Sequence, residues 1–263
     1  MANTYIYREF VQRTVLVTGG ARGIGAAVAQ RFVDLGANVV VADLQDPHPA
    51  GSLGRDTAQG DSKFMFIAAD VSKDEDCRNV VEKTQQAFGR IDVLFNNAGI
   101  TRRASVVETT EEEWDRVLDT NLKSVFLLSK RVVPVMIANG GGAIVNTASG
   151  WGLVGGANAA SYCASKGGVV LLTKAMAVDH GKHNIRVNCI CPGDVRTQML
   201  IDESRQLGLA ETKLVENGVN RPLGRVGEPD EIAAAVIYLA SSMASFVTGT
   251  ALVVDGGGLA GSQ

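Results

Sequence analysis

Residues 14–25 read Thr-Val-Leu-Val-Thr-Gly-Gly-Ala-Arg-Gly-Ile-Gly, and this stretch decides the fold. The apolar run 14–17 predicts a buried strand, and the periodic segment that begins at Ile24 predicts a helix. Gly19, Gly23 and Gly25 let the chain turn tightly and admit a pyrophosphate against bare backbone. Unpaired N–H groups at the start of the helix favour the same anion. The stretch therefore predicts a strand, a phosphate-binding turn and a helix.

The spacing of these glycines is Gly-x-x-x-Gly-x-Gly, which differs from the Gly-x-Gly-x-x-Gly dinucleotide fingerprint. A glycine cluster by itself could also be an ordinary turn. Here it lies between a strand and a helix at the start of a βαβ unit, and this context favours phosphate binding. We therefore expect the following loop residues to contact a nucleotide cofactor: Gly19, Arg22, Gly23, Ile24 and Gly25.

Strand-like and helix-like segments alternate along the rest of the chain. Further apolar runs, typical of parallel strands buried on both faces, occupy residues 39–42, 64–69, 91–95, 143–146, 186–190 and 251–254. Helical periodicity occupies residues 24–35, 74–88, 111–137, 161–180 and 228–240, with Thr109 or Thr110 as the cap of the third helix. The alternation predicts one α/β domain over residues 1–263, with a doubly wound, seven-stranded parallel sheet and helices on both faces.

Two segments do not follow this alternation. Residues 46–62 are rich in Pro, Gly, Asp and Ser, which predicts a surface loop. Residues 197–218 are polar and weakly helical, and they follow the sixth strand, where an α/β sheet places its ligand crevice. We expect either a lid over the substrate or a plain surface insertion at 197–218.

Composition excludes several classes of protein. The chain has 263 residues, 46% hydrophobic and 20% charged, with a net charge of -3 and no basic run, so no nucleic-acid surface is expected. Its four cysteines lack a redox or zinc spacing and its three histidines lie apart, so we expect free thiols and no metal. No stretch approaches the ~20 apolar residues of a membrane span. These observations predict a cytoplasmic protein without membrane association.

Ser149, Tyr162 and Lys166 are the candidate catalytic residues. Tyr162 and Lys166 are four residues apart, so on a helix both side chains lie on one face. A neighbouring ammonium favours the phenolate, so we expect Lys166 to lower the pKa of Tyr162 and to make it a proton donor or acceptor near neutral pH. Ser149 follows the fifth strand and would place its hydroxyl on the same substrate oxygen. A lone serine there would more often be a loop or cap residue.

Asp43 follows the second strand, 18 residues after Gly25. A carboxylate at this place can accept hydrogen bonds from both ribose hydroxyls of adenosine, and it would repel the 2′-phosphate of NADP. Arg22 instead favours NADP, because its side chain could reach that phosphate from the glycine loop. We expect NAD in preference to NADP. Asp43 could also be simply a turn residue at the end of the strand, and this alternative does not conflict with a role in binding the ribose.

The glycine loop is followed, in order, by Asp70-Val71, Asn96-Asn97-Ala98-Gly99, Asn121, Ser149, Tyr162 with Lys166, and Pro192-Gly193. In this order and spacing, the chain from about Thr14 to Gly258 resembles the short-chain dehydrogenase/reductase family. The resemblance implies a Rossmann-type domain, a nicotinamide cofactor and hydride transfer at an alcohol carbon.

The resemblance also implies a role for each matching residue. Tyr162 would be the general acid and base, Lys166 would lower its pKa and hold the nicotinamide ribose, and Ser149 would orient the substrate. Asn121 would hold a water that links Lys166 to solvent, although an asparagine inside a helix could also mark a kink. The remaining cofactor contacts would come from Asp70 and Val71 at the adenine, Asn97 and Gly99 at the ribose edge, and Pro192, Val195 and Thr197 at the nicotinamide.

The sequence therefore predicts an NAD-dependent oxidoreductase that interconverts a secondary alcohol, of a polyol, sugar or hydroxylated ring, with its carbonyl compound. Candidate pocket residues are Trp151, Leu153, Val154, Asn158, Asp194, Gln198 and Met199, beside Ser149 and Tyr162. Arg102 and Arg103 could attract an anion at the pocket mouth or could be solvated loop residues.

Two other functions remain open. An NADPH-dependent 3-oxoacyl-(acyl-carrier-protein) reductase is the first, because Gly99-Ile100-Thr101-Arg102 is similar to that branch, and the second is a non-catalytic nucleotide-sensing protein. The family resemblance further implies a homotetramer formed through helices 111–137 and 161–180 and the C-terminal segment. The apolar residues Val125, Leu128, Val169 and Leu172 fit such an interface or, equally, the core.

Overall fold

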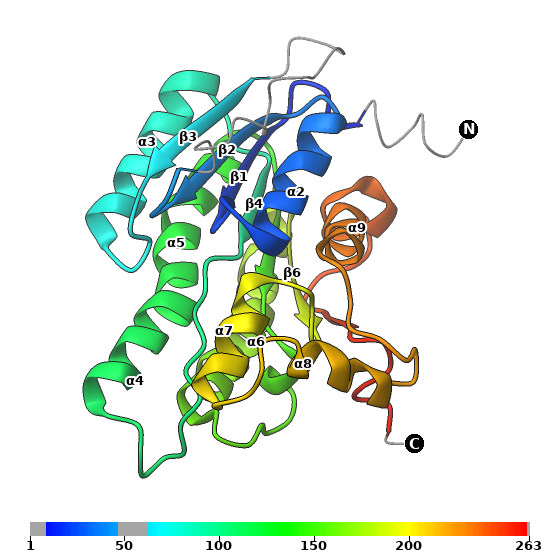
Figure 1. The fold of residues 1–263 in the computed structure, drawn as a ribbon. Helices are drawn as coiled ribbons and strands as arrows, with labels where there is room; N and C mark the ends of the chain where they lie inside the picture. Colours follow the sequence, from blue (N-terminus) through cyan, green and yellow to red (C-terminus); the bar gives the residue numbers. More distant parts are fainter. Residues whose placement is uncertain (1–8, 47–62, 262–263) are drawn as a thin grey trace.

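The computed structural model describes residues 9–46 and 63–261, which form one parallel sheet with helices on both faces (Figure 1). The strands are β1 (Thr14–Thr18), β2 (Asn38–Asp43), β3 (Phe64–Ala68), β4 (Val93–Asn96), β5 (Gly142–Thr147), β6 (Ile185–Pro192) and β7 (Ala251–Val254). The helices are α2 (Gly23–Asp34), α3 (Asp74–Phe88), α4 (Glu111–Leu118), α5 (Ser124–Ala138), α6 (Ala160–His180), α7 (Gln198–Gln206), α8 (Lys213–Glu216) and α9 (Pro229–Ala240). Across the described ranges, none of these helices has the length and apolar character needed to cross a membrane.

The order of the strands in the sheet places the ligand crevice. The strands lie in the order β3-β2-β1-β4-β5-β6-β7, and each neighbouring pair is parallel. The winding reverses between β1 and β4, and in open α/β sheets ligands bind outside the carboxyl ends of the strands at such a reversal. The glycine loop follows β1, and Asn97 follows β4, so both predicted cofactor segments lie at this point.

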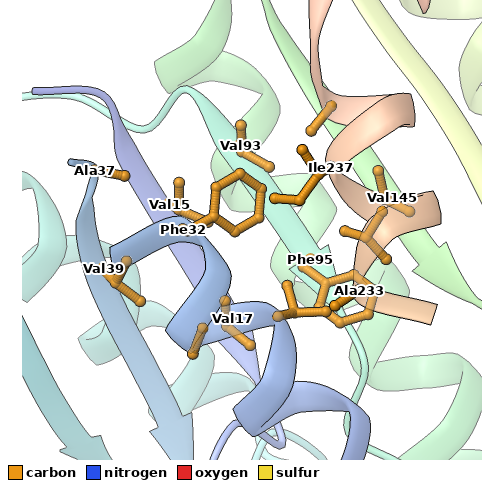
Figure 2. Close-up of a cluster of buried hydrophobic side chains, with 14 of the residues drawn as sticks. Val15, Val17, Phe32, Ala37, Val39, Val93, Phe95, Val145, Ala233 and Ile237 are labelled. Carbon is orange, nitrogen blue, oxygen red and sulfur yellow. The ribbon is translucent and has the colours of Figure 1, made fainter. Parts of the chain in front are cut away.

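Alternation along the strands builds a hydrophobic layer on each face of the sheet. In β1, Val15 and Val17 point to the face covered by α2 and α9, whereas Leu16 points to the opposite face. Figure 2 shows the first layer, where Phe32 of α2 and Ile237 of α9 meet over the strands. The second layer lies under α3, α5 and α6. Both faces are therefore largely apolar, and the polar side chains that are open to a ligand lie at the ends of the strands.

The glycine loop has a backbone that other residues could not adopt. Gly19 has a φ of +62°, and a β-carbon there would lie 2.7 Å from the Cα of Ala98. A β-carbon at Gly25 would lie 2.0 Å from the carbonyl oxygen of Gly19. The loop folds back on the first turn of α2, so Gly19 requires glycine for space as well as for conformation, and Gly25 requires it for space.

The predicted helix 111–137 is present, but its interior is irregular. Thr110 caps it by accepting a hydrogen bond from the N–H of Glu113, as expected. Between α4 and α5, Asp119–Lys123 forms a π-helical turn, and this turn carries Asn121. One extra residue is thereby inserted into the turn, an irregularity that sequence periodicity does not reveal.

The structure tests only one of the two predictions for the segments outside the strand–helix alternation. The loop expected at 46–62 lies, apart from Asp46, outside the described residues. The segment 197–218 is more helical than expected, because it contains α7, α8 and the start of the 3-10 turn Asn217–Asn220. Thr197 precedes α7 and lies close to the glycine loop, since a β-carbon at Gly23 would be 3.3 Å from its Cγ2.

Candidate active site

Ser149, Tyr162 and Lys166 lie together at the carboxyl end of β5. The strand ends at Thr147, and the Ser149 Oγ accepts a hydrogen bond from the Trp151 N–H (3.1 Å) in the short 3-10 turn that follows. Tyr162 and Lys166 lie one turn apart in α6, which packs against that 3-10 turn. A hydrogen bond joins the Ser149 and Tyr162 side chains. The structure thus brings together the three candidate catalytic residues.

The ammonium of Lys166 is buried at the centre of the site. Only 3% of the residue is exposed, and its Nζ donates a 2.7 Å hydrogen bond to the carbonyl oxygen of Thr147. The same Nζ lies 5.7 Å from the centre of the Tyr162 ring. Burial disfavours the charged form and lowers the pKa of Lys166 from 10.5 to about 8. At neutral pH most of the protein therefore still carries a positive charge beside the Tyr162 ring.

The phenol of Tyr162 differs from the sequence-based expectation. Burial raises its pKa above the ordinary value of 10.0, and the hydrogen bond with Ser149 opposes this only in part. Lys166 directs its ammonium to the Thr147 carbonyl, so it does not offset the cost of burying a phenolate. In this structure Tyr162 therefore holds its proton at neutral pH and can donate a hydrogen bond.

Asn121 lies behind the catalytic trio and is 1% exposed. Its Oδ1 accepts a hydrogen bond from the Ile100 N–H (2.8 Å), and its Nδ2 donates to the Ile100 carbonyl (2.9 Å) and the Ser165 Oγ (3.0 Å). Both amide hydrogens are thus bound to protein atoms, and they fasten the segment after β4 to α6. The helix kink that we considered as an alternative role for Asn121 corresponds to the π-helical turn Asp119–Lys123. Such turns are frequent at functional sites.

Asp43 and the glycine loop form the opposite end of the site. Asp43 is the last residue of β2, and its two carboxylate oxygens accept hydrogen bonds from the N–H groups of Ala21 (3.0 Å) and Gln45 (3.2 Å). The Asn97 Nδ2 donates to the carbonyl oxygen of Gly19 at 2.9 Å. These contacts hold the acid, the loop and the end of β4 in one arrangement.

A single cavity of about 740 Å³ connects the two ends. Most of the residues that the sequence assigned to the site line it: Gly19, Arg22, Gly23, Ile24, Asp43, Asp70, Val71, Asn97, Gly99, Ser149, Trp151, Tyr162, Lys166, Pro192, Asp194, Val195 and Thr197, together with Gln198 and Met199. Gly25 and Asn121 do not line it. They support it from behind, Gly25 against Gly19 and Asn121 against Gly99.

The residues at the Asp43 end fit a nicotinamide dinucleotide. The residue before α2, Arg22, makes no side-chain hydrogen bond to the helix start, so its side chain leaves the N–H groups of the first turn to an anion. The absence of side chains at Gly19 and Gly23 leaves bare backbone along the cavity wall. Asp43 supplies a fixed acceptor for ribose hydroxyls at the end of the next strand.

The substrate end contains side chains that the sequence analysis did not assign to the site. Glu203 from α7, Arg221 from the following segment and Leu259 near the C-terminus all line the cavity. Arg221 donates a 2.5 Å hydrogen bond to the Asp194 carboxylate. These three residues come from segments that are distant in sequence from the catalytic trio. They do not belong to a motif with a fixed spacing, so the sequence pattern does not reveal them. A weak signal for Glu203 was its place in the polar segment 197–218.

Several sequence-based assignments at this end are wrong. Asn158 is exposed in a turn with a φ of +51° and does not line the cavity, and neither do the exposed Leu153 and Val154. Arg103 is not a solvated loop residue, because its side chain is only 10% exposed and pairs with Glu203 at 3.3 Å. Arg102 remains partly solvated, with a side chain 39% exposed that pairs with Glu113 at 2.7 Å.

Comparison with known proteins identifies the class to which this fold and site belong. The family model described as enoyl-(acyl carrier protein) reductase matches residues 19–258. The chain belongs to the short-chain dehydrogenase/reductase family. It is an oxidoreductase of the type that acts on CH–OH groups with a nicotinamide cofactor.

Individual relatives cover nearly the whole chain. A 3-oxoacyl-(acyl-carrier-protein) reductase FabG from Chlamydia muridarum is 40% identical over 247 residues, which is 94% of this chain and 97% of the relative. An L-fucose dehydrogenase from Mus musculus is 39% identical over 246 residues, covering 93% and 88%. The crystal structure of a levodione reductase matches with a TM-score of 0.90 and 39% identity, covering 94% and 98%. Relatives with different substrates are therefore similar to this chain to nearly the same degree.

The buried ammonium of Lys166 predicts a specific pH dependence of stability. Between pH 8 and roughly pH 10 the unfolded chain holds the Lys166 proton and the folded protein releases it, so the free energy of unfolding rises with pH in that window. Over this interval we expect the free energy of unfolding of the wild type to rise by about 2 kcal/mol relative to that of Lys166→Met. Urea unfolding of the cofactor-free proteins measures this difference. Parallel pH profiles for the two proteins would show that the folded protein does not depress this pKa.

Proposed function

We propose that the protein is an NAD-dependent dehydrogenase that interconverts a secondary alcohol, of a polyol, sugar or hydroxylated ring, with its carbonyl compound. The observation that carries the proposal is the continuous cavity from Asp43 to Ser149, Tyr162 and Lys166. One end suits an adenosine ribose and the other suits a reacting alcohol. The size of the cavity is compatible with an elongated cofactor and a small substrate.

The nicotinamide supplies the hydride chemistry when it is bound, and the protein supplies the proton and the electrostatics. For carbonyl reduction, the Tyr162 hydroxyl donates its proton to the substrate oxygen. For alcohol oxidation, Tyr162 has to be in its phenolate form, and its oxygen then accepts the proton of the substrate hydroxyl. The Ser149 hydroxyl binds the same substrate oxygen and stabilises the charge that develops on it. Asn121 holds the segment after β4 against α6 and thereby positions Lys166.

The preference for NAD rests on the geometry of Asp43. Its two carboxylate oxygens are held by the N–H groups of Ala21 and Gln45, so the negative charge is fixed at the cavity wall. A phosphate dianion placed there would be repelled, whereas ribose hydroxyls would be bound. Arg22 is exposed on the glycine loop and favours NADP, and this supports a second candidate, an NADPH-dependent 3-oxoacyl-(acyl-carrier-protein) reductase like the Chlamydia muridarum relative.

The α7 segment supports the proposal of a substrate lid within residues 197–218. Gln198, Met199, Leu200 and Glu203 of α7 line the cavity, and α7 begins beside the glycine loop. A helix that contacts both ends of the cavity is well placed to shield the substrate from water.

A substrate panel tests the proposed function. We expect NADH to form from NAD with neutral polyols, free sugars or hydroxylated rings, and at least about tenfold lower kcat/KM with NADP. Asp43→Ser is expected to reduce this cofactor preference, because it removes the fixed charge. Activity confined to NADPH and an acetoacetyl thioester would replace the proposal with the reductase, and the absence of turnover on every substrate would contradict both.

We also propose a cytoplasmic homotetramer, and the apolar surface of two helices supports the assembly. Val125, Leu128 and Val169 are buried within one chain, so they do not form an interface as the sequence allowed, and Leu172 is partly buried. The large exposed apolar side chains on α5 and α6 are instead Phe126, Ile137, Leu171 and Val178. We expect Leu171→Glu to shift sedimentation from tetramer to smaller species. A wild-type monomer at micromolar concentration would contradict the proposal.

A further inference from the structure

The substrate end of the cavity is walled by charged side chains from separate parts of the fold. Glu203 of α7 and Asp194, which follows β6, both line it with carboxylates. Asp194 is paired with Arg221 at 2.5 Å. The Glu203 side chain is 13% exposed, so its carboxylate is largely removed from water while it still faces the cavity.

Arg103 holds Glu203 from behind. Its Nη1 lies 3.3 Å from the Glu203 Oε2, and its backbone N–H donates to the Gln206 side chain one turn further along α7 (2.9 Å). The guanidinium also stacks over Trp151, with its Cζ 4.7 Å from the ring centre. Trp151 in turn meets the Tyr162 ring edge to face at 6.2 Å. A chain of contacts therefore fixes Glu203 relative to the proposed proton donor.

The Glu203 carboxylate has capacity for a further donor. Its hydrogen bond with Arg103, at 3.3 Å, is longer than the 2.7–2.9 Å that is usual for a charge-assisted bond. Among the described residues no other donor to this carboxylate is seen. The Arg103 Nε is likewise buried without a partner. Desolvation, reinforced by the charge of Asp194, raises the pKa of Glu203 to about 7. The Glu203 carboxylate, which lines the cavity, is thus incompletely satisfied.

We propose that Glu203, held by Arg103, is the specificity residue that binds a substrate hydroxyl remote from the reacting carbon, so that the site takes a neutral polyhydroxylated substrate. This inference rests on the proposed function and narrows it. A carboxylate accepts hydrogen bonds from hydroxyls and repels anions. Of the two carboxylates at this end, Asp194 is already paired with Arg221, so Glu203 is the one available to a substrate hydroxyl. A site that binds a substrate hydroxyl through a buried polar group discriminates strongly against analogues without it. An acidic or purely hydrocarbon substrate tail would leave Glu203 with only the long hydrogen bond from Arg103 and no donor from the cavity.

The substitution Glu203→Gln tests this role, with Glu75→Gln as the matched control on an exposed carboxylate of α3 that pairs with Arg78. With the best neutral polyol or sugar of the panel, we expect Glu203→Gln to raise KM at least about tenfold and to change kcat less. Glu75→Gln should leave both constants unchanged. NADH binding, measured by fluorescence, checks that each variant keeps the cofactor site.

The pH dependence of KM distinguishes hydrogen bonding by the Glu203 carboxylate from a purely structural role of the side chain, because packing alone would not make KM depend on pH. The charged and titratable groups that face Glu203 are Arg103, Asp194 and Tyr162, with Arg221 bound to Asp194. As the pH falls through about 7, Glu203 takes up a proton and loses acceptor capacity, so KM for the polyol should rise in wild type. This rise should be absent in Glu203→Gln. If that variant does not fold, the wild-type profile decides.

A pair of substrates that share the 4-hydroxycyclohexyl ring completes the test. Wild type should prefer cyclohexane-1,4-diol over 4-hydroxycyclohexanecarboxylate, because the second hydroxyl meets Glu203 and a carboxylate is repelled. A preference for the carboxylate, an unchanged KM in Glu203→Gln or a flat wild-type pH profile of KM would overturn the inference while the dehydrogenase activity stands. The absence of any alcohol-dependent NADH formation would instead contradict the proposed function.

Discussion

The hydrogen bond from the buried ammonium of Lys166 to the carbonyl of Thr147 is the interaction on which the site depends. It ties α6 to the end of β5, the two elements that carry Tyr162 and Ser149. An ammonium with 3% exposure is costly to bury, so the surrounding structure must hold it firmly. Asn121 helps by bonding Ser165, the neighbour of Lys166 in α6.

The rest of the fold explains why such a polar centre is possible. Both faces of the sheet are covered by apolar layers, one under α2 and α9 and the other under α3, α5 and α6 (Figure 1). Only the carboxyl ends of the strands remain for polar side chains, and the reversal of winding between β1 and β4 opens a crevice there. Asp43, the glycine loop and Lys166 therefore share one cavity although they are distant in sequence.

Much of this arrangement could be predicted from sequence, because apolar periodicity reports burial and the glycines report backbone geometry. The seven strands, the main helices and the trio at the end of β5 were predictable on that basis. The π-helical turn at Asn121 was not, since one inserted residue barely alters the periodicity. Glu203 and Arg221 were missed because only tertiary packing brings them to the cavity. The raised pKa of Tyr162 depends on burial, which the spacing of Tyr162 and Lys166 does not report.

We propose that Tyr162 exchanges the proton of the reacting alcohol in a site that binds the cofactor independently of the Tyr162 hydroxyl. The most direct test measures NADH binding and steady-state turnover on one preparation of Tyr162→Phe. We predict binding close to that of wild type and a loss of turnover of about 10²–10⁴-fold, the usual contribution of a positioned acid or base. Wild-type turnover by a correctly folded Tyr162→Phe protein would contradict the account.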